Sequence, residues 1–372
     1  MTKVTADGGS GHADGADGVE GSDGVDVVAL GESMVTFLPS RAGRLADVPS
    51  FDRGIGGAES NVACALAAAG HRTRWVSRVG ADGFGDHLVE AIARYGVDTR
   101  AVRRDPHRPT GIYFRTADDR DTDAHEVLYY RAGSAASAMS PDPADVDHEA
   151  LASGRILHLS GITAALSADC LALLRELTAP RPGRPLVSFD VNYRPGLWSG
   201  AAGEGPRVLL DIARGADLVF VGEDEAADAW GVTGGPDAIR AALPEPATLV
   251  VKQGSQGATV YTEGESAVHQ AALKVDVVAP VGAGDAFAAG FLSATLRGLP
   301  ADQRLRHGHL MAAAALTVPG DLATPPARQD ADRLAALDAD AWGTLRLGPG
   351  WTDGVPQNDV PVNTEAKEEA RT

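Results

Sequence analysis

The strongest chemical signal in the sequence is a turn of small residues that ends in an acid. Residues 280–290 read Pro-Val-Gly-Ala-Gly-Asp-Ala-Phe-Ala-Ala-Gly. Gly282, Ala283 and Gly284 allow the backbone to turn tightly and to approach a ligand closely. A helix-forming run follows, so their N–H groups would lie at a helix N-terminus, where an anion is stabilised. Asp285 would lie beside that anion site, with a carboxylate that can accept a proton from an alcohol.

A base next to an anion hole suits the transfer of a phosphoryl group from ATP to a hydroxyl group. The same short motif would also make an ordinary helix start, in which Asp285 only complements the helix dipole. The rest of the sequence has to decide between these two interpretations.

The segments around this turn alternate between strand and helix patterns. Short apolar runs predict buried strands at residues 25–30, 74–79, 155–159, 186–190, 218–221 and 248–252. Helical patterns lie between them or close the chain, at residues 58–69, 83–95, 168–177, 206–214, 223–230, 285–297 and 304–316. This alternation predicts an α/β fold with a mainly parallel sheet.

Two segments, about 34–54 and 101–131, interrupt this rhythm with alternating polar and apolar residues. We expect them to form a small β-sheet outside the main one, with antiparallel strands on either side of an Asp-rich turn at residues 118–123. Such an appendage could act as a lid; a peripheral hairpin without function is the alternative. The predicted organisation is an acidic, unstructured extension (1–24), one domain (25–345) that carries the lid, and a flexible tail (346–372).

The composition narrows the class of protein. A chain of 372 residues with 44% hydrophobic content can bury a sizeable core. A net charge of −18 argues against a nucleic-acid partner. Cys64 and Cys170 cannot make a disulfide framework, no apolar run approaches the length of a membrane span, and the N-terminal residues lack a signal-like apolar stretch. We therefore expect a cytoplasmic protein without a membrane partner.

Two signatures together resemble the ribokinase (PfkB) family of sugar kinases. The first is Gly-Gly-Ala-Glu-Ser-Asn-Val-Ala at residues 56–63, followed by Gly-Ala-Asp-Gly-Phe-Gly at 80–85; the second is the 282–285 turn. The resemblance covers roughly residues 25–345. It implies a ribokinase-like three-layer α/β/α fold with a β-sheet lid, and ATP-dependent phosphorylation of a sugar. Within the family, the chain most resembles the branch that phosphorylates 2-keto-3-deoxygluconate.

Several residues match the sugar-binding positions that this resemblance implies. Gly56 and Gly57 precede a helix, so their backbone could approach a bound sugar, and the amide of Asn61 could donate and accept toward hydroxyl groups. Alternatively, Asn61 is only a polar residue at a helix start.

A further set of residues points to a sugar that carries a carboxylate. The stretches Tyr-Tyr-Arg-Ala-Gly-Ser-Ala at 129–135 and Asp-Val-Asn-Tyr-Arg-Pro-Gly-Leu-Trp at 190–198 resemble the sugar-acid branch. Arg131 and Arg194 could pair with the carboxylate, and Tyr113 and Tyr129 could supply hydroxyls and ring faces. The alternative is that these arginines are surface residues and the tyrosines core residues.

The nucleotide side of the site matches the family segment K-x-G-x-x-G. Lys252 could meet the phosphates, and Gly254 and Gly257 would allow a turn beside them, together with Gly282 and Gly284. The resemblance also implies Mg²⁺ bound with ATP and held largely through water, with Glu225 as the indirect metal residue.

Two positions depart from the family pattern. Gly222 stands where relatives have an Asn that helps to organise metal and phosphate, and Ala279 stands where many have an Asp near a monovalent-cation site. We therefore expect weak or no potassium activation. The alternatives to a sugar-acid kinase are a neutral-sugar kinase of the fructokinase or ribokinase type and a binding protein with impaired catalysis. A homodimer through the lid is plausible.

Overall fold

The computed structural model describes residues 24–41, 43–116, 127–198 and 205–353. The predicted N-terminal extension, the Asp-rich turn at 118–123 and most of the predicted tail lie outside the described residues.

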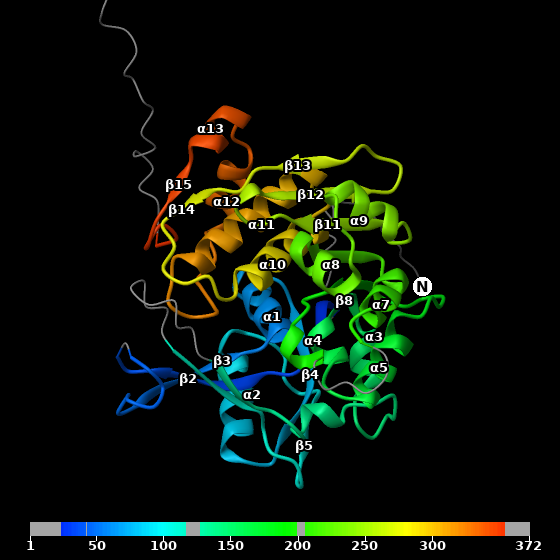
Figure 1. Ribbon diagram of the computed structural model, residues 1–372, viewed down its shortest axis with the longest axis vertical. Coiled ribbons are helices and arrows are strands. Elements are labelled where there is room, and N and C mark those ends of the chain that lie inside the picture. Colours follow the sequence, from blue (N-terminus) through cyan, green and yellow to red (C-terminus); the bar gives the residue numbers. More distant parts are fainter. Residues whose placement is uncertain (1–23, 42, 117–126, 199–204, 354–372) are drawn as a thin grey trace, which may run out of the picture.

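Within the described residues, nine strands form the main sheet (Figure 1). From one edge to the other they are β13 (Val268–Gln270), β12 (Ala258–Thr262), β11 (Thr248–Lys252), β10 (Leu218–Gly222), β9 (Leu186–Asp190), β8 (Gly154–Ser160), β1 (Val25–Leu30), β4 (Thr73–Gly80) and β5 (Val102–Asp105). Neighbouring strands pair in parallel from β5 at one side of the sheet as far as β11. The last two pairings, β11 with β12 and β12 with β13, are antiparallel. The carboxyl ends of the parallel strands therefore meet at one edge, where α/β proteins bind ligands.

Helices cover both faces of this sheet, as the alternating sequence pattern predicts (Figure 1). One core joins the sheet to α5 (Ala168–Thr178), α7 (Val208–Gly215), α8 (Glu223–Trp230) and α9 (Pro236–Ala242), near the short helices α3 (His148–Ala152), α4 (Gly161–Ala164) and α6 (Pro195–Trp198). The core on the other face joins it to α1 (Ala58–Ala68), α10 (Ala283–Leu296) and α11 (Ala301–Leu316). Phe220 of β10 illustrates the packing, because its ring meets that of Phe291 edge-on, with 5.4 Å between the centroids.

The second sheet is the predicted lid. It has the order β3 (Phe51–Gly56), β2 (Met34–Pro39), β6 (Ile112–Arg115), β7 (Val127–Tyr130). β6 and β7 are antiparallel, as expected, but β2 and β6 are parallel. The start of the second lid segment differs from the prediction. β5 lies within the predicted segment 101–131 but pairs with β4 in the main sheet.

The chain after residue 345 also differs from the prediction of a flexible tail. Residues 346–347 form β15 (Arg346–Leu347), which pairs in parallel with β14 (Lys274–Val275). Leu347 and Trp351 join an apolar cluster with Trp342 of α13 (Ala339–Thr344) and with α12 (Arg328–Ala335). Apolar burial thus holds this segment as far as residue 351.

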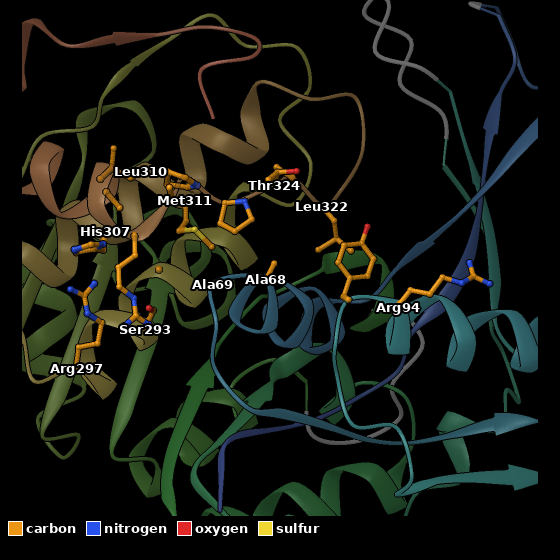
Figure 2. A pocket seen from close by; sticks show the side chains of 18 residues that line it. Ala68, Ala69, Arg94, Ser293, Arg297, His307, Leu310, Met311, Leu322 and Thr324 are labelled. Carbon is orange, nitrogen blue, oxygen red and sulfur yellow. The ribbon is translucent and has the colours of Figure 1, made fainter. Parts of the chain in front are cut away.

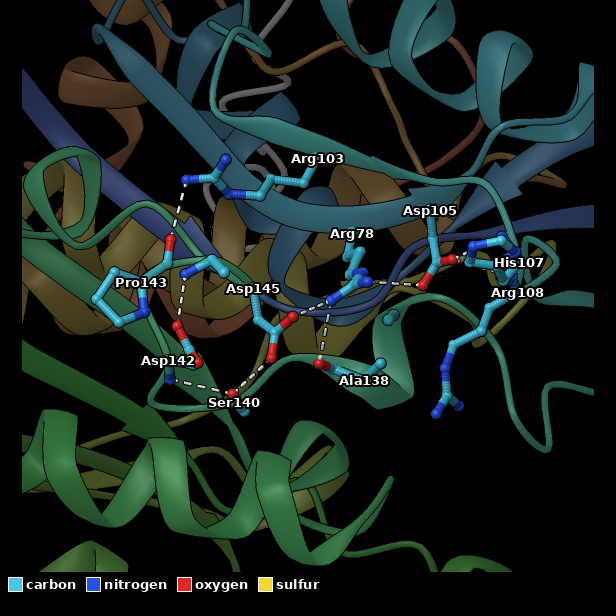
Figure 3. Close-up of polar contacts among 12 residues, drawn as sticks. Arg78, Arg103, Asp105, His107, Arg108, Ala138, Ser140, Asp142, Pro143 and Asp145 are labelled. Atoms are coloured by element: carbon cyan, nitrogen blue, oxygen red, sulfur yellow. Dashed lines mark hydrogen bonds and ion pairs between the residues drawn. The ribbon is translucent and has the colours of Figure 1, made fainter.

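A half-buried arginine, Arg78, fixes the segment that follows the lid (Figure 3). Arg78 of β4 forms an ion pair with Asp105 at 2.9 Å, a second one with Asp145, and a hydrogen bond to the carbonyl of Ala138 at 3.5 Å. These contacts join two strands of the main sheet to residues 138–145, directly after the predicted sugar-acid stretch at 129–135.

No helix among the described residues is long and apolar enough to cross a membrane.

Candidate active site

The predicted turn begins α10 in a conformation that only glycine adopts easily. Gly282 is the N-cap residue of α10, with a φ angle of +76°. A Cβ atom placed on Gly282 would lie 2.2 Å from the carbonyl oxygen of Asp321, so the close approach of two backbones also requires glycine. The helix that follows spans residues Ala283–Leu296, which makes its N-terminus a substantial anion-binding position.

Asp285 lies in the first turn of α10 and is only partly exposed. The loss of hydration raises the pKa of its carboxyl group to about 7, and the negative charge of Asp190 adds to this rise. A hydrogen bond from Nδ2 of Asn61, at 2.9 Å, acts in the opposite direction because it stabilises the carboxylate. A carboxyl group with this pKa can act as a general base near neutral pH.

Asn61 brings α1 into the same site. It is buried, and its Oδ1 atom has no hydrogen-bond partner among the described residues. Because buried polar atoms rarely stay unpaired, this oxygen is well suited to accept a hydrogen bond from a ligand hydroxyl. The two glycines before α1 fit tightly: a Cβ on Gly56 would lie 2.4 Å from the Tyr113 hydroxyl, and one on Gly57 would lie 2.5 Å from the carbonyl oxygen of Glu32.

The carboxyl ends of β9 and β11 supply a buried ion pair beside the turn. Lys252 Nζ lies 3.0 Å and 3.1 Å from the two carboxylate oxygens of Asp190, and this attraction raises the pKa of Lys252 to about 12 despite its burial. A Cβ on Gly284 would lie 4.0 Å from the same Nζ atom, which places the ammonium group next to the anion-binding turn. Gly254 and Gly257 then reverse the chain with φ angles of +56° and +130°.

Glu225 and Arg194 lie on the same side of the site. Glu225 Oε2 accepts a hydrogen bond from the Gly222 N–H at 2.7 Å, and its Oε1 lies 3.7 Å from Arg194 Nη1. Burial raises the pKa of Glu225. The chain reaches Arg194 through Asn192, which has a φ angle of +41°, unusual for a residue other than glycine.

Arg131 is already ion-paired in the structure. Its Nε donates to Glu32 Oε2 at 2.7 Å, its Nη2 contacts the same oxygen, and Ser134 donates to Oε1. Beneath this group lies Glu59, which is fully buried and accepts from Thr163 Oγ1 at 2.6 Å.

The two predicted tyrosines face the site from the lid. Tyr113 and Tyr129 pair across β6 and β7, with 5.4 Å between their ring centroids. The Tyr113 hydroxyl donates to Asp321 at 3.2 Å, and Arg115 pairs with the other oxygen of Asp321 at 3.0 Å. Asp321 therefore lies against the lid.

The structure thus brings together α1, α10, the ends of β9 and β11, and the lid. No cluster of three or more metal-binding side chains occurs in the described part of the chain. Asp190 is neutralised by Lys252, and one oxygen of Glu225 is used within its own helix start. This donor set fits a Mg²⁺ ion that is held mainly by phosphate oxygens and water.

Sequence reasoning did not assign roles to Glu32, Glu59 or Asp190, and it placed Asp321 only in the wall of an adenine pocket. Asp190 ends β9 and Glu32 follows β1, and the carboxyl ends of these strands meet at one edge of the sheet, so strand position was a usable signal for both. Asp321 lies in a loop far along the chain, and no local pattern indicates its contact with the lid.

Comparisons with known proteins agree with this architecture. The family described as pfkB family carbohydrate kinase matches residues 25–328. A 2-dehydro-3-deoxygluconokinase from Thermoproteus tenax is 35% identical over 312 residues, covering 83% of this chain and 94% of that protein. The crystal structure of a PfkB protein from Polaromonas sp. JS666 is 34% identical, with a TM-score of 0.72, covering 83% of this chain and 99% of that one.

A more distant structure, a putative ribokinase II from E. coli in complex with ATP and Mg²⁺, has a TM-score of 0.71. It is 24% identical and covers 83% of this chain and 98% of its own, so it supports the fold alone.

The chain belongs to the PfkB family of carbohydrate kinases. It is a sugar kinase, a phosphotransferase with an alcohol group as acceptor, and the family, the fold class and the class of enzyme predicted from the sequence are confirmed.

Proposed function

We propose that the protein phosphorylates the primary hydroxyl group of a sugar acid, 2-keto-3-deoxygluconate, and forms the 6-phosphate. The observation that carries the proposal is the position of Asp285, whose pKa is about 7, beside the Gly282 turn and within the electrostatic reach of Arg194. Asp285 as base and the 282–284 turn as anion hole would carry out phosphoryl transfer, and the two arginines would bind the carboxylate of an acidic substrate.

In the proposed reaction, Asp285 accepts the proton of the primary hydroxyl as the hydroxyl oxygen attacks the γ-phosphate of ATP, the bond from the γ-phosphorus to the bridging oxygen breaks, and ADP leaves. The N–H groups of residues 282–284 stabilise charge on the transferring phosphoryl group. Lys252 and the turn at Gly254 and Gly257 hold the nucleotide phosphates, and Asn61 positions the sugar while it holds Asp285 in place. Mg²⁺ bound with ATP would neutralise phosphate charge, and Glu225 would hold the ion indirectly, through a water molecule.

The two arginines would contribute unequally to carboxylate binding. Glu32 occupies Nε and Nη2 of Arg131, so a sugar carboxylate would meet Arg131 through Nη1. Arg194 has a side chain that is 55% exposed and a carboxylate neighbour at 3.7 Å, beyond hydrogen-bond distance. We therefore assign the larger part of carboxylate recognition to Arg194, with Tyr113 and Tyr129 lining the same pocket.

The outer face of the lid supports the proposal of a homodimer. Phe37 and Phe114 stack there with 4.8 Å between centroids, and Tyr130 and Leu128 on the same face are 61% and 40% exposed. A second copy that covers this face would remove apolar surface from water and would support the lid.

Sedimentation should show a dimer in the wild-type protein and a monomer after Tyr130→Glu.

The test of the function is a coupled assay of ADP release with ATP and Mg²⁺. The panel contains 2-keto-3-deoxygluconate, its C4 epimer 2-keto-3-deoxygalactonate, fructose and ribose. We expect the two keto-deoxy acids to have the highest kcat/KM, and Asp285→Asn to reduce kcat by at least about a hundredfold. If fructose or ribose is preferred, the enzyme is a neutral-sugar kinase. If ligands bind without turnover, the protein is catalytically impaired.

Ala279 replaces the Asp that many relatives have near a monovalent-cation site, and this buried alanine offers no side-chain oxygen. We therefore propose that the enzyme is active without added potassium. The same assay tests this with sodium or potassium chloride at equal ionic strength. Activation by potassium of more than about threefold would contradict it.

A further inference from the structure

A cavity of about 470 Å³ lies apart from the proposed active site (Figure 2). Its walls come from the ends of α1 and α2 (Gly83–Arg94), from α10 and α11, and from residues 322–328, which lead into α12. Neither Asp285 nor any arginine assigned to sugar binding lines it. A volume of this size accommodates a small organic molecule.

The charge of the lining is unusual for this protein. Three arginines, Arg94, Arg297 and Arg328, line the cavity together with His307, and no aspartate or glutamate does. The whole chain carries a net charge of −18, whereas the side chains that line this cavity include three arginines and no carboxylate. Such a lining attracts anions.

The polar groups lie at opposite ends of the cavity (Figure 2). Arg297, His307 and Ser293 lie together at one end, whereas Arg94 extends at the other, beyond Leu322. Ala68 and Ala69 lie between the two ends, and Leu310 and Met311 add further apolar lining. A complementary ligand would have an anionic group at each end and a short carbon chain between them.

The arginines differ in how far protein carboxylates already neutralise them. Arg297 binds both carboxylate oxygens of Asp332, at 2.7 Å and 2.8 Å, and Arg94 Nη2 lies 3.5 Å from Glu90 Oε2 at the surface. No ion pair to Arg328 occurs within the described residues. Arg328 also begins α12, whose N-cap residue, Ala327, provides no side-chain cap. Arg328 and the free N–H groups of this helix start therefore offer an anion both a charge and hydrogen-bond donors.

We propose that this cavity is a second binding site, for small organic acids that also carry a phosphate group. The phosphate would lie beside Arg328, where the uncapped start of α12 adds N–H donors, and the carboxylate would lie toward Arg94. The lining residues alone carry this proposal, so it does not depend on which sugar the active site accepts.

The test is titration calorimetry of the full-length protein saturated with ADP, with 3-phosphoglycerate as the probe. We expect 3-phosphoglycerate to bind more tightly than glycerol 3-phosphate, which lacks the carboxylate, and than inorganic phosphate. Arg328→Gln and Arg94→Gln should each weaken binding by about tenfold, because each removes a charged hydrogen-bond donor. Both side chains lie at the surface, so unchanged melting temperatures should confirm that the variants fold.

Two control variants distinguish binding in this cavity from a general charge effect and from binding at the sugar site. Arg333→Gln removes the same charge from the same helix, outside the cavity, and should leave the affinity within about twofold. Arg194→Ala should also leave it unchanged. The proposal is overturned if 3-phosphoglycerate does not bind at millimolar concentration, if Arg328→Gln and Arg94→Gln both bind it normally, or if only Arg194→Ala loses it, since binding would then be at the sugar site.

Discussion

At the scale of single residues, the environment of Asp285 determines its chemistry. Burial raises the pKa of this carboxyl group to about 7, and the Asn61 amide partly counteracts the rise. The proposed base would therefore be about half ionised at pH 7 and mostly ionised above it, and it would lose its function when protonated. Its proton affinity is then high enough for it to accept a proton from an attacking alcohol.

This balance predicts a pH profile. In the wild type, kcat/KM should fall as the pH decreases through about 7, because Asp285 becomes protonated. Asn61→Ala removes a hydrogen bond that stabilises the carboxylate, so the acid limb should move to higher pH. Ser60→Ala is the matched control, since Ser60 bonds to Ser33 and not to Asp285. An unchanged acid limb in Asn61→Ala would show that Asp285 is not the titrating group.

The sequence indicated which residues could do chemistry, but not how they are paired. Asp285 and Asn61 were both predicted site residues, yet 224 positions separate them and only the fold reveals their hydrogen bond. Arg131 was predicted to bind the sugar carboxylate, and no sequence pattern indicated that Glu32 pairs with it. Long-range pairs of this kind have no local signature, because side-chain contacts depend on how distant elements pack.

At the scale of elements, the start of α10 depends on one backbone conformation. Gly282 has a φ angle of +76° and lies against the carbonyl of Asp321, which in turn binds the lid through Tyr113. Asp321 therefore contacts both the lid and the turn that we propose as the anion hole.

Gly282→Ala should disturb this arrangement severely. Its Cβ would lie 2.2 Å from the Asp321 oxygen, and the left-handed conformation costs about 1–2 kcal/mol for alanine, so both stability and kcat should fall. Gly284→Ala is the control for stability, because its Cβ would have no contact closer than 4.0 Å in the folded protein. Melting temperature measures the effect on stability, and steady-state kinetics measure the effect of Gly282→Ala on kcat. Equal melting temperatures for the two variants would contradict this account.

The periodicity of the sequence predicted these elements well where burial imposes a pattern. Strands buried on both faces read as short apolar runs, and α1 and α10, which are buried on nearly every side, read as runs of small and apolar residues. β1, β8 to β11, α1 and α10 lie close to their predicted bounds. β5 was assigned to the lid because it lies within the segment 101–131, whereas its own four residues, Val-Arg-Arg-Asp, show no clear alternation. Which sheet an edge strand joins depends on tertiary contacts that the pattern does not contain.

At the scale of the whole molecule, buried carboxyl groups make the folding free energy depend on pH. Glu59 is fully buried, and the loss of hydration raises its pKa from 4.5 to about 8. Between these values the folded protein keeps Glu59 protonated while the unfolded chain ionises it. Folding then takes up a proton, so this contribution to stability is present below pH 4.5 and is lost as the pH rises toward 8.

Glu59→Gln should remove this dependence, because glutamine is neutral at every pH and can still accept from Thr163. The variant should gain unfolding free energy relative to the wild type as the pH rises, by about 1.4 kcal/mol per unit. Urea unfolding at about pH 6 and about pH 8 measures the difference. Glu90→Gln, at an exposed position on α2, should show no such trend. A constant difference between Glu59→Gln and wild type would indicate that Glu59 is ionised in the fold.

The central claim is that this sugar kinase recognises a substrate carboxylate through Arg194. The most direct test measures kcat/KM for 2-keto-3-deoxygluconate and for the best neutral sugar of the panel, in the wild type and in Arg194→Ala. Loss of a charge-assisted contact predicts a decrease of about tenfold to a hundredfold for the acid and a change of less than about threefold for the neutral sugar. An equal decrease for both substrates, or none for the acid, would contradict the claim.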